Sequence, residues 1–402
     1  MPTDDMPRGH GDSHPPSEHE SIPVLEVADE AEILTVLPAG PVAEAPPHPG
    51  VRWALLWCFG IYLVQTFAVL LGIVLYIVGV ILTHDRSFAE MLEQAQRGER
   101  ELLDYLLTPQ GKEMLANLLL PIFACVQVMF VVYAWAATRL VVGKEWARVV
   151  ALRRSSYAHL LLALLCLPGL TLLAVAIDTL VKDLLPPLVD MEQFADVLGA
   201  WPLLVGILLI GVGAGVAEEL FFRGFLGRGI VGRHGVWWGV FWTSLLFGLI
   251  HLEPRQVCYA TVMGVFLHSI YLMTRSLWLP ILLHTLNNSL AVAATRSPTL
   301  AALEEATQAH WWLLFLGAEM LLAVGLWAMY RSRVRLVLRE GPDLLPWHLP
   351  YPGVEHPPPN STYRLEYPPV GWAASAVVLL AVAVFIAAAA GWWLLSFGGW
   401  TT

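Results

Sequence analysis

Residues 201–228 read WPLLVGILLIGVGAGVAEELFFRGFLGR, and this stretch holds the features on which both the fold and the function of the chain depend. Its first part, residues 201–217, contains no charged side chain, and Glu218, Glu219 and Arg223 then follow. A run of about 20 apolar residues is long enough to cross a bilayer. Ionisable groups inside such a run are costly and are by default candidates for function. The stretch therefore predicts a membrane-spanning helix that carries a functional site.

The composition of the whole chain agrees with a membrane protein. Of its 402 residues, 57% are hydrophobic and only 14% are charged, against about 25% charged in an ordinary soluble domain. The 17 Trp and 11 Tyr residues suit the water–lipid interfaces that both rings favour. No run of Lys and Arg indicates nucleic acid. We expect membrane lipid and a membrane-associated peptide or protein substrate as partners, and no nucleic acid.

The distribution of apolar residues predicts an all-α, polytopic transmembrane helix bundle of about nine spans, with a catalytic core of four to five helices. The fifth and sixth spans are short, and only four residues, 253–256, separate them. The predicted spans are 52–82, 114–138, 157–181, 201–228, 236–252, 257–274, 277–296, 311–331 and 372–398.

These spans divide the chain into six segments, beginning with a tail that is rich in Pro, His, Glu and Asp and expected to be disordered. The segments are a disordered cytoplasmic tail at 1–51, two peripheral spans with an outer amphipathic segment (83–113) at 52–156, a catalytic membrane core at 157–296, an additional span at 297–331, a Pro-rich cytoplasmic segment at 332–371 and a C-terminal span at 372–402.

The positive charges predict the orientation of the chain. With a cytoplasmic N-terminus, the inner segments hold 15 Lys and Arg residues and the outer segments hold 7, while Arg223 lies within a span. Cytoplasmic loops carry the excess of positive charge. We therefore expect an integral, multi-pass protein of a bacterial inner (plasma) membrane, with the N-terminus in the cytoplasm and the C-terminus outside.

The three ionisable residues of the fourth span predict a division of labour. Glu219 and Arg223 are four residues apart, so they share a helix face and can pair. Glu218 is turned about 100° from Glu219. We expect Glu219 and Arg223 to form a structural ion pair that leaves Glu218 free to act. The alternative is that all three groups only neutralise one another.

Two later spans add imidazole and amide groups to this set. The fifth span ends in Phe247-Gly-Leu-Ile-His251, and the seventh contains His284-Thr-Leu-Asn287-Asn288. His284 and Asn288 are four apart and share a face. Each of these side chains alone is more often a hydrogen-bonding residue of helix packing, but so many costly groups on three spans favour a site. His268, on the sixth span, has no partner at helical spacing and is interpreted as a packing residue.

Together, the patterns Glu-Glu-x-x-x-Arg, Phe-x-x-x-His and His-x-x-x-Asn resemble the three motifs of the CPBP family. This is the group of CAAX proteases and bacteriocin-processing (Abi) intramembrane endopeptidases that includes the type II CAAX prenyl endopeptidase. The resemblance covers residues 157–296, about a third of the chain. It implies an intramembrane peptide hydrolase whose catalytic residues are Glu218, His251, His284 and Asn288, with Glu219, Arg223 and Phe247 in support.

The resemblance also implies roles for these residues. Glu218 would activate the attacking water with help from His251, and His284 and Asn288 would stabilise the oxyanion. The family is classed as metalloproteases, although a metal-free glutamate mechanism is also proposed for it. No cofactor is therefore assigned with certainty, and zinc remains an alternative.

The residues themselves allow both chemistries. A zinc site would use Glu218, His251 and His284 as ligands with water as the fourth, and it would leave no separate general base except Glu219. A metal-free site gives every group a task, with Glu218 as general base and His284 and Asn288 as oxyanion donors. We expect the metal-free arrangement.

The depths of these side chains raise a difficulty. Counting ~1.5 Å per helical residue from the predicted inner ends, Glu218 lies ~15 Å deep, His284 ~12 Å and His251 ~22 Å. His251 can then reach the other two only if the fifth span begins lower or tilts.

A second class of function is a non-enzymatic transporter or membrane scaffold. The same Glu, His and Arg cluster could bind an ion, a proton or a lipid. Inverted repeats or two interrupted helices in matching halves would favour a transporter, and the sequence shows neither. We therefore place the endopeptidase first.

Overall fold

A computed structural model describes residues 49–188, 191–296, 311–340, 343–347 and 362–397. Residues 1–48 of the predicted tail lie outside the described residues. So do residues 297–310 of the additional span segment and much of the Pro-rich segment. The described residues belong to one unit, residues 45–402.

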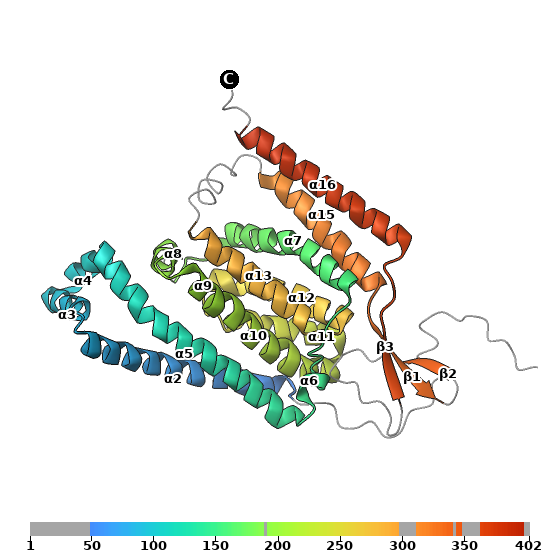
Figure 1. Cartoon of the computed structure of the whole chain (residues 1–402), viewed down its shortest axis with the longest axis horizontal. Helices are drawn as coiled ribbons and strands as arrows, with labels where there is room; N and C mark the ends of the chain where they lie inside the picture. The colour runs from blue at the N-terminus through green and yellow to red at the C-terminus, as the bar shows by residue number, and fades with distance from the viewer. Residues whose placement is uncertain (1–48, 189–190, 297–310, 341–342, 348–361, 398–402) are drawn as a thin grey trace, which may run out of the picture. The chain divides into compact units, whose positions relative to one another are not determined.

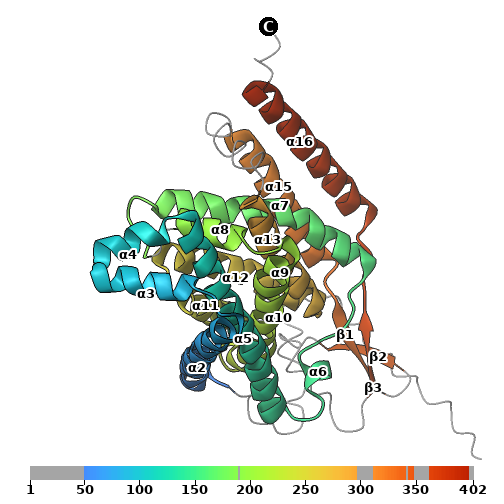
Figure 2. The ribbon, with the colours of Figure 1, turned by 60° about the vertical axis from the view of Figure 1, so that its left-hand side comes forward.

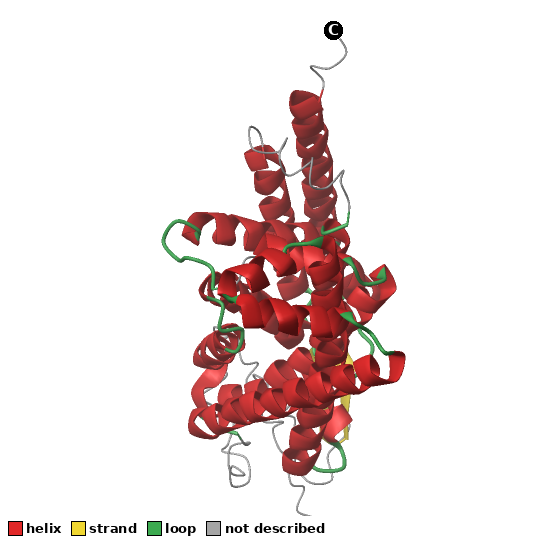
Figure 3. Ribbon diagram, turned by 90° about the vertical axis from the view of Figure 1, so that its left-hand side faces the viewer, coloured by secondary structure: helices red, strands yellow, loops and turns green. Residues whose placement is uncertain are grey.

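Helices dominate the described part of the chain (Figure 3), which confirms the predicted helical membrane bundle. Their bounds are α2 Val51–Thr83, α3 Ser87–Arg97, α4 Glu99–Leu106, α5 Pro109–Val142, α6 Trp146–Val149, α7 Tyr157–Val181, α8 Met191–Gly199, α9 Leu203–Gly206, η1 Ile207–Gly213, α10 Ala214–Glu219, η2 Leu220–Gly227, α11 Arg228–Leu249, α12 Pro254–Thr274, α13 Trp278–Ala294, α15 Trp311–Arg331 and α16 Trp372–Phe397.

Within the described residues, seven helices are long and apolar enough to cross a membrane, where the sequence predicted nine spans. Two features account for the difference. The predicted fourth and fifth spans form one continuous run, Leu203–Leu249. The predicted seventh span corresponds to α13, which at 17 residues is shorter than the about 20 residues that cross a bilayer unaided.

The long run Leu203–Leu249 reverses its direction at Gly235, which has φ 76° and ψ 172°. These angles suit glycine alone. In a straight helix Val231 and Gly239 would be about 12 Å apart along the axis. A Cβ atom added to Gly239 would instead lie 2.5 Å from the Cα atom of Val231. The run is therefore a helical hairpin of two antiparallel arms.

Helices α2 and α5 pack against each other along their length at one side of the bundle (Figure 1). Their close approach depends on Gly72, where an added Cβ would lie 2.5 Å from the Cα atom of Ile122. Large apolar side chains such as Leu56, Phe67 and Val132 are more than half exposed, as expected for lipid-facing helices. The amphipathic segment predicted at 83–113 contains the short helices α3 and α4.

On the other side of the bundle, α15 packs between α7 and α16, with α7 also against α12 (Figures 1 and 2). Leu170, Leu322 and Met329 are buried in the apolar cluster that joins α7 to α15. A second apolar cluster surrounds Phe221 and Phe222, which lie on the hairpin and are fully buried, with Phe221 packed against Phe130 of α5. Ala217, next to Glu218, belongs to the second cluster, and Leu283, next to His284, belongs to the first.

The Pro-rich segment contains a small sheet that the sequence analysis did not predict. Strands β1 Arg335–Glu340, β2 Asp343–Trp347 and β3 Thr362–Glu366 pair antiparallel in the order β2-β1-β3. Val337 lies opposite Pro346 on one side and Arg364 on the other. The sheet connects α15 to α16, because β1 follows the first of these helices and β3 precedes the second (Figure 2).

Candidate active site

The hairpin in the chain brings Glu218 and His251 to the same depth. Glu218 lies 17 residues before the turn at Gly235 and His251 lies 16 residues after it, so both are about 25 Å from the turn along their arms. The predicted mismatch in depth was therefore wrong. It arose because the inner end of the fourth span was placed at Arg228, whereas the helix continues to the turn.

Helix α10 carries both glutamates and lies directly against α13. A Cβ added to Gly215 would lie 2.5 Å from the hydroxyl oxygen of Thr285 and 3.3 Å from the carbonyl oxygen of Ile281. Only a glycine therefore lets the two helices approach so closely. Glu218 and Glu219, one turn further along α10, face His284, which directly precedes Thr285 on α13. Two π-helical segments, η1 and η2, flank α10, and such segments are frequent at functional sites.

The predicted ion pair between Glu219 and Arg223 is confirmed. Nη1 of Arg223 donates to Oε1 of Glu219 at 2.7 Å, and both side chains are fully buried. The guanidinium also donates to the carbonyl oxygen of Gly264 at 3.3 Å and lies over the ring of Phe247, 4.3 Å from its centre. Arg223 is thus held by α10, α11 and α12 together.

His284 lies between the two glutamates. Its Nδ1 atom is 2.8 Å from Oε1 of Glu219, and its Nε2 atom is 3.8 Å from Oε2 of Glu218. Because the ion-paired carboxylate can only accept a hydrogen bond, Nδ1 carries the proton. The ion pair therefore fixes the orientation of the His284 ring and points its Nε2 atom at Glu218.

His251 approaches Glu218 from the end of α11. Its Nε2 atom lies 3.9 Å from the same Oε2 atom of Glu218. Its Nδ1 atom donates to the carbonyl oxygen of Phe247 at 3.0 Å, so Nε2 holds the lone pair in the neutral ring. The ring of Phe247 packs edge-on against both imidazoles, with centroids 5.3 Å and 5.8 Å away. Phe247 is thus the apolar spacer between the two histidines.

Glu218 is the least satisfied group of this cluster. Its side chain is almost completely buried, and within the described residues its Oε2 atom has no hydrogen-bond partner. The two imidazole nitrogens lie just beyond direct hydrogen-bonding distance of that atom. A buried carboxylate oxygen without a partner is expensive, and distances of this size are typical of groups that act through a bridging molecule.

Asn288 shares the helix face of His284 but makes a different contact. Its side-chain amide donates to the carbonyl oxygen of Ile210 in η1 at 3.2 Å. An asparagine amide has a second N–H, so a role as oxyanion donor stays a prediction. The neighbouring Asn287 accepts a hydrogen bond from Thr171 of α7 at 2.9 Å.

The sequence did not predict the two backbone carbonyl groups that bind Arg223 and Asn288, or the hydrogen bond of the second asparagine, Asn287. The carbonyl oxygens of Gly264 and Ile210 receive Arg223 and Asn288, and Asn287 ties α13 to α7. A pattern of side chains cannot predict which backbone carbonyl oxygen accepts a hydrogen bond, because every residue has one. Asn287 could have been found, because an amide in an apolar span needs a partner.

The cluster does not have the spacing of a zinc site. Three ligands of a tetrahedral zinc ion with bonds of about 2.0–2.2 Å lie about 3.4 Å apart. Oε2 of Glu218 is 3.9 Å from Nε2 of His251 and 3.8 Å from Nε2 of His284. Among the described residues, no group of three His, Cys, Asp or Glu side chains is placed to hold a metal ion.

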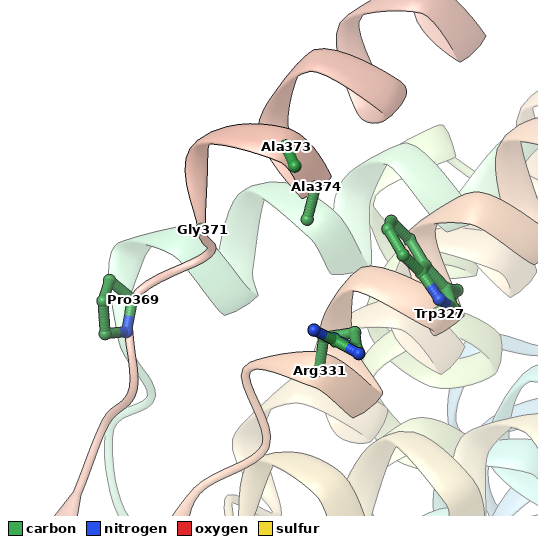
Figure 4. Close-up of a pocket in the computed structure, with 6 residues that line it drawn as sticks. All are labelled: Trp327, Arg331, Pro369, Gly371, Ala373 and Ala374. Atoms are coloured by element: carbon green, nitrogen blue, oxygen red, sulfur yellow. The ribbon is translucent and has the colours of Figure 1, made fainter.

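A pocket elsewhere in the structure does not belong to this cluster. It lies between the end of α15 and the start of α16 (Figure 4). Its lining residues are Trp327, Arg331, Pro369, Gly371, Ala373 and Ala374. Arg331 is the only charged side chain among them, and none is a carboxylate or an imidazole, so the lining offers no general base.

Two comparisons with known proteins match part of this chain, and one of them covers the residues of the cluster. Residues 200–290 match the family model described as type II CAAX prenyl endopeptidase Rce1-like. A protein of Bacillus subtilis (strain 168) named "Putative membrane peptidase YdiL" is 26% identical over 116 residues, which are 29% of this chain and 47% of that protein. The chain thus covers about half the length of this relative. No solved structure matches.

The two matches confirm the resemblance to the CPBP group that the three motifs predicted. The matched residues include Glu218, Glu219, Arg223, His251, His284 and Asn288, and they exclude α2, α5, α15 and α16. With its apolar helices, the chain is an integral, multi-pass membrane protein.

Proposed function

We propose that this chain is an intramembrane endopeptidase that hydrolyses a peptide bond with a water molecule activated by Glu218. One observation carries the proposal. The buried Oε2 atom of Glu218 lacks a partner among the described residues, and the Nε2 atoms of His251 and His284 lie 3.9 Å and 3.8 Å from it. These three atoms come from three different spans and can surround one water molecule.

The charges of the cluster assign the protons. Glu218 and Glu219 carry two negative charges and Arg223 one positive charge, so one proton is needed to make the group neutral. Neutrality matters because an unpaired buried charge costs several kcal/mol. His284 lies between both carboxylates and is the natural place for that proton. An imidazolium at His284 donates from both nitrogens, to Glu219 through Nδ1 and into the site through Nε2.

The reaction then gives each group a task. Glu218 takes a proton from water while the water oxygen attacks the carbonyl carbon of the substrate. The Nε2–H of His284 and the second N–H of Asn288 stabilise the oxyanion, and His251 orients the water. When the tetrahedral intermediate collapses, the C–N bond breaks and Glu218 gives its proton to the leaving amine. The pair of Glu219 and Arg223 holds His284 in place throughout.

The substrate is a peptide segment within or at the membrane, because the catalytic groups lie between apolar helices. The matched family model names a CAAX prenyl endopeptidase, but nothing in this chain identifies a prenyl group as part of its own substrate. We further propose that the N-terminus is cytoplasmic in a bacterial inner membrane, as the distribution of positive charge predicts.

Proteomic comparison of membranes tests this function. Cells producing the wild type should accumulate new peptide termini in membrane proteins, and cells producing Glu218→Gln should not. Glu319→Gln is the matched control, because Glu319 is a carboxylate on the apolar helix α15 outside the residues matched by the family model. The control variant should cleave like the wild type.

Continued cleavage by Glu218→Gln would contradict the role of this residue. Equal loss in both variants would indicate that buried carboxylates maintain the fold rather than the chemistry. No cleavage by the wild type, together with ion or proton flux that depends on Glu218 in liposomes, would favour the transporter.

A further inference from the structure

Glu253 lies two residues beyond His251 and is buried, although it begins a helix at the edge of the bundle. It occupies the N-cap position of α12, where a side chain usually accepts a hydrogen bond from its own first turn. Its carboxylate makes no such bond. Instead, Oε2 accepts the backbone N–H of Leu188 at 2.9 Å. Oε1 is buried without a partner among the described residues.

The turn that carries His251 is not held by a regular helix. Helix α11 ends at Leu249, and α12 begins at Pro254. Between them, Leu252 has a φ of 61°, which is a strained conformation for a side chain other than glycine. The N–H of Glu253 donates to the carbonyl oxygen of His251 at 2.7 Å. The His251 ring is therefore held from two sides, by its own bond to the carbonyl oxygen of Phe247 and by the turn that joins it to Glu253.

What fixes Glu253 is the connection between α7 and α8. Its bond to Leu188 joins residues that are 65 positions apart in sequence. A second, weaker link lies nearby, because Arg255 of α12 is 3.5 Å from Asp178 near the end of α7, with both side chains partly exposed. Leu184 and Leu188 are 77% and 71% exposed, so this connection lies at the surface of the bundle.

We propose that Glu253 is a positioning residue, which anchors the connection of α7 and α8 and thereby holds His251 within reach of Glu218. The geometry forms one chain of contacts, from the N–H of Leu188 to the carboxylate of Glu253, through the turn to His251, and from His251 to Glu218. This inference rests on the proposed function for its effect on catalysis. The positioning of His251 itself can be measured without any substrate.

The test compares Glu253→Ala and Glu253→Gln with the control Asp178→Asn. Glutamine keeps an oxygen that can accept the N–H of Leu188, whereas alanine does not. Asp178→Asn weakens the nearby, partly exposed link to Arg255 and leaves the bond between Glu253 and Leu188 in place. Each variant is purified as the full chain in lipid nanodiscs, and three quantities are measured: the exchange of the Leu188 amide with deuterium, the rate at which diethyl pyrocarbonate modifies His251, and the kcat and KM of peptide cleavage.

Glu253→Ala should speed exchange at Leu188 by about tenfold or more, because the amide loses its acceptor. It should also raise the modification rate of His251 and lower kcat by about 10–100-fold with KM changed less than about twofold, since misplacing a catalytic group by about 1 Å has effects of this size. Glu253→Gln should restore all three quantities to nearly wild-type values, and Asp178→Asn should leave them unchanged.

Faster exchange at Leu188 with unchanged His251 reactivity and unchanged kcat would overturn the inference, because Glu253 would then support only the surface connection. A Gln variant as impaired as the Ala variant would overturn it as well. If the wild type cleaves no peptide, the proposed function fails, and the His251 modification rates still decide whether Glu253 positions this residue.

Discussion

The helices at the rim of the bundle and the helices around Glu218 are built from the same apolar residues but treat polar groups in opposite ways. The most apolar windows of α2 and α5 are 17% and 11% buried inside the structure, against 39% for the hairpin Leu203–Leu249 and 44% for α12. Glu218, Glu219 and Arg223 lie on the hairpin, which is one of the more buried runs. Protein rather than lipid surrounds them, which is the condition under which an intramembrane charge is tolerated.

The comparison also separates two uses of a close helix contact. Gly72 lets α2 approach α5 in a contact made of apolar side chains. Gly215 lets α10 approach α13 and places Glu218 and Glu219 against His284. Tight packing therefore joins apolar side chains at the rim and brings the proposed catalytic groups together at the centre.

The largest expected effect is on the stability of the buried ion pair. Glu219→Gln leaves Arg223 buried without its carboxylate, and breaking such a pair costs about 3–5 kcal/mol. Glu218→Gln should cost far less stability, because Oε2 of Glu218 makes no direct hydrogen bond among the described residues. Equilibrium unfolding of both variants in detergent micelles measures the difference. Equal destabilisation would show that the two carboxylates do not differ in role.

The next effect is on catalysis through the oxyanion donors. His284→Ala should lower kcat by about 10²–10³ with little change in KM, the pattern of a lost transition-state donor. Asn288→Ala should lower kcat less than His284→Ala, because one of its N–H groups donates to Ile210. Steady-state kinetics on a cleaved peptide measures both. A rise in KM at constant kcat would place these residues in substrate binding instead.

The sequence was sufficient to predict the bundle, the Glu219–Arg223 pair and the three spans that meet at Glu218. Helical spacing within one span fixes which side chains share a face, and the motifs of the family added the order of the spans. The meeting of His251 with Glu218 could not be derived, because it depends on where the hairpin turns. The turn lies at Gly235, seven residues beyond the predicted end of the span, and glycine is too common in this chain to mark it.

The hydrogen bonds of Asn288 and Glu253 could not be predicted from the sequence for a different reason. Asn288 donates to a carbonyl oxygen in η1, and Glu253 accepts from a backbone N–H in the connection after α7. Every residue except proline offers both backbone groups, so no residue pattern identifies the partner. Such contacts follow only from the packing of complete elements.

A smaller effect compares the two close contacts directly. Gly215→Ala forces α10 and α13 apart, since the added Cβ would lie 2.5 Å from the hydroxyl of Thr285. We expect kcat to fall by about tenfold or more, because the distance from the glutamates to His284 increases. Gly72→Ala makes an equally close contact with Ile122 and should lower the melting temperature while leaving the kcat of the folded protein unchanged. A similar loss of kcat in both variants would mean that the rim and the centre are mechanically coupled.

The smallest expected effect is that of metal removal, which should leave activity unchanged. Oε2 of Glu218 is 3.8 Å and 3.9 Å from the two imidazole nitrogens, which is wider than the about 3.4 Å between ligands of a tetrahedral zinc ion. Asn288 is a poor zinc ligand but a good donor, and it lies one helical turn from His284.

Purified enzyme should therefore turn over with far less than one metal ion per chain and should resist extensive chelation. His251→Ala provides the control. If His251 is a zinc ligand, added Zn²⁺ should restore part of the activity that this variant loses. If His251 only orients water, added Zn²⁺ should restore none of it. One zinc ion per active molecule, lost in step with activity and regained with added Zn²⁺, would show that Glu218 is a ligand rather than the general base.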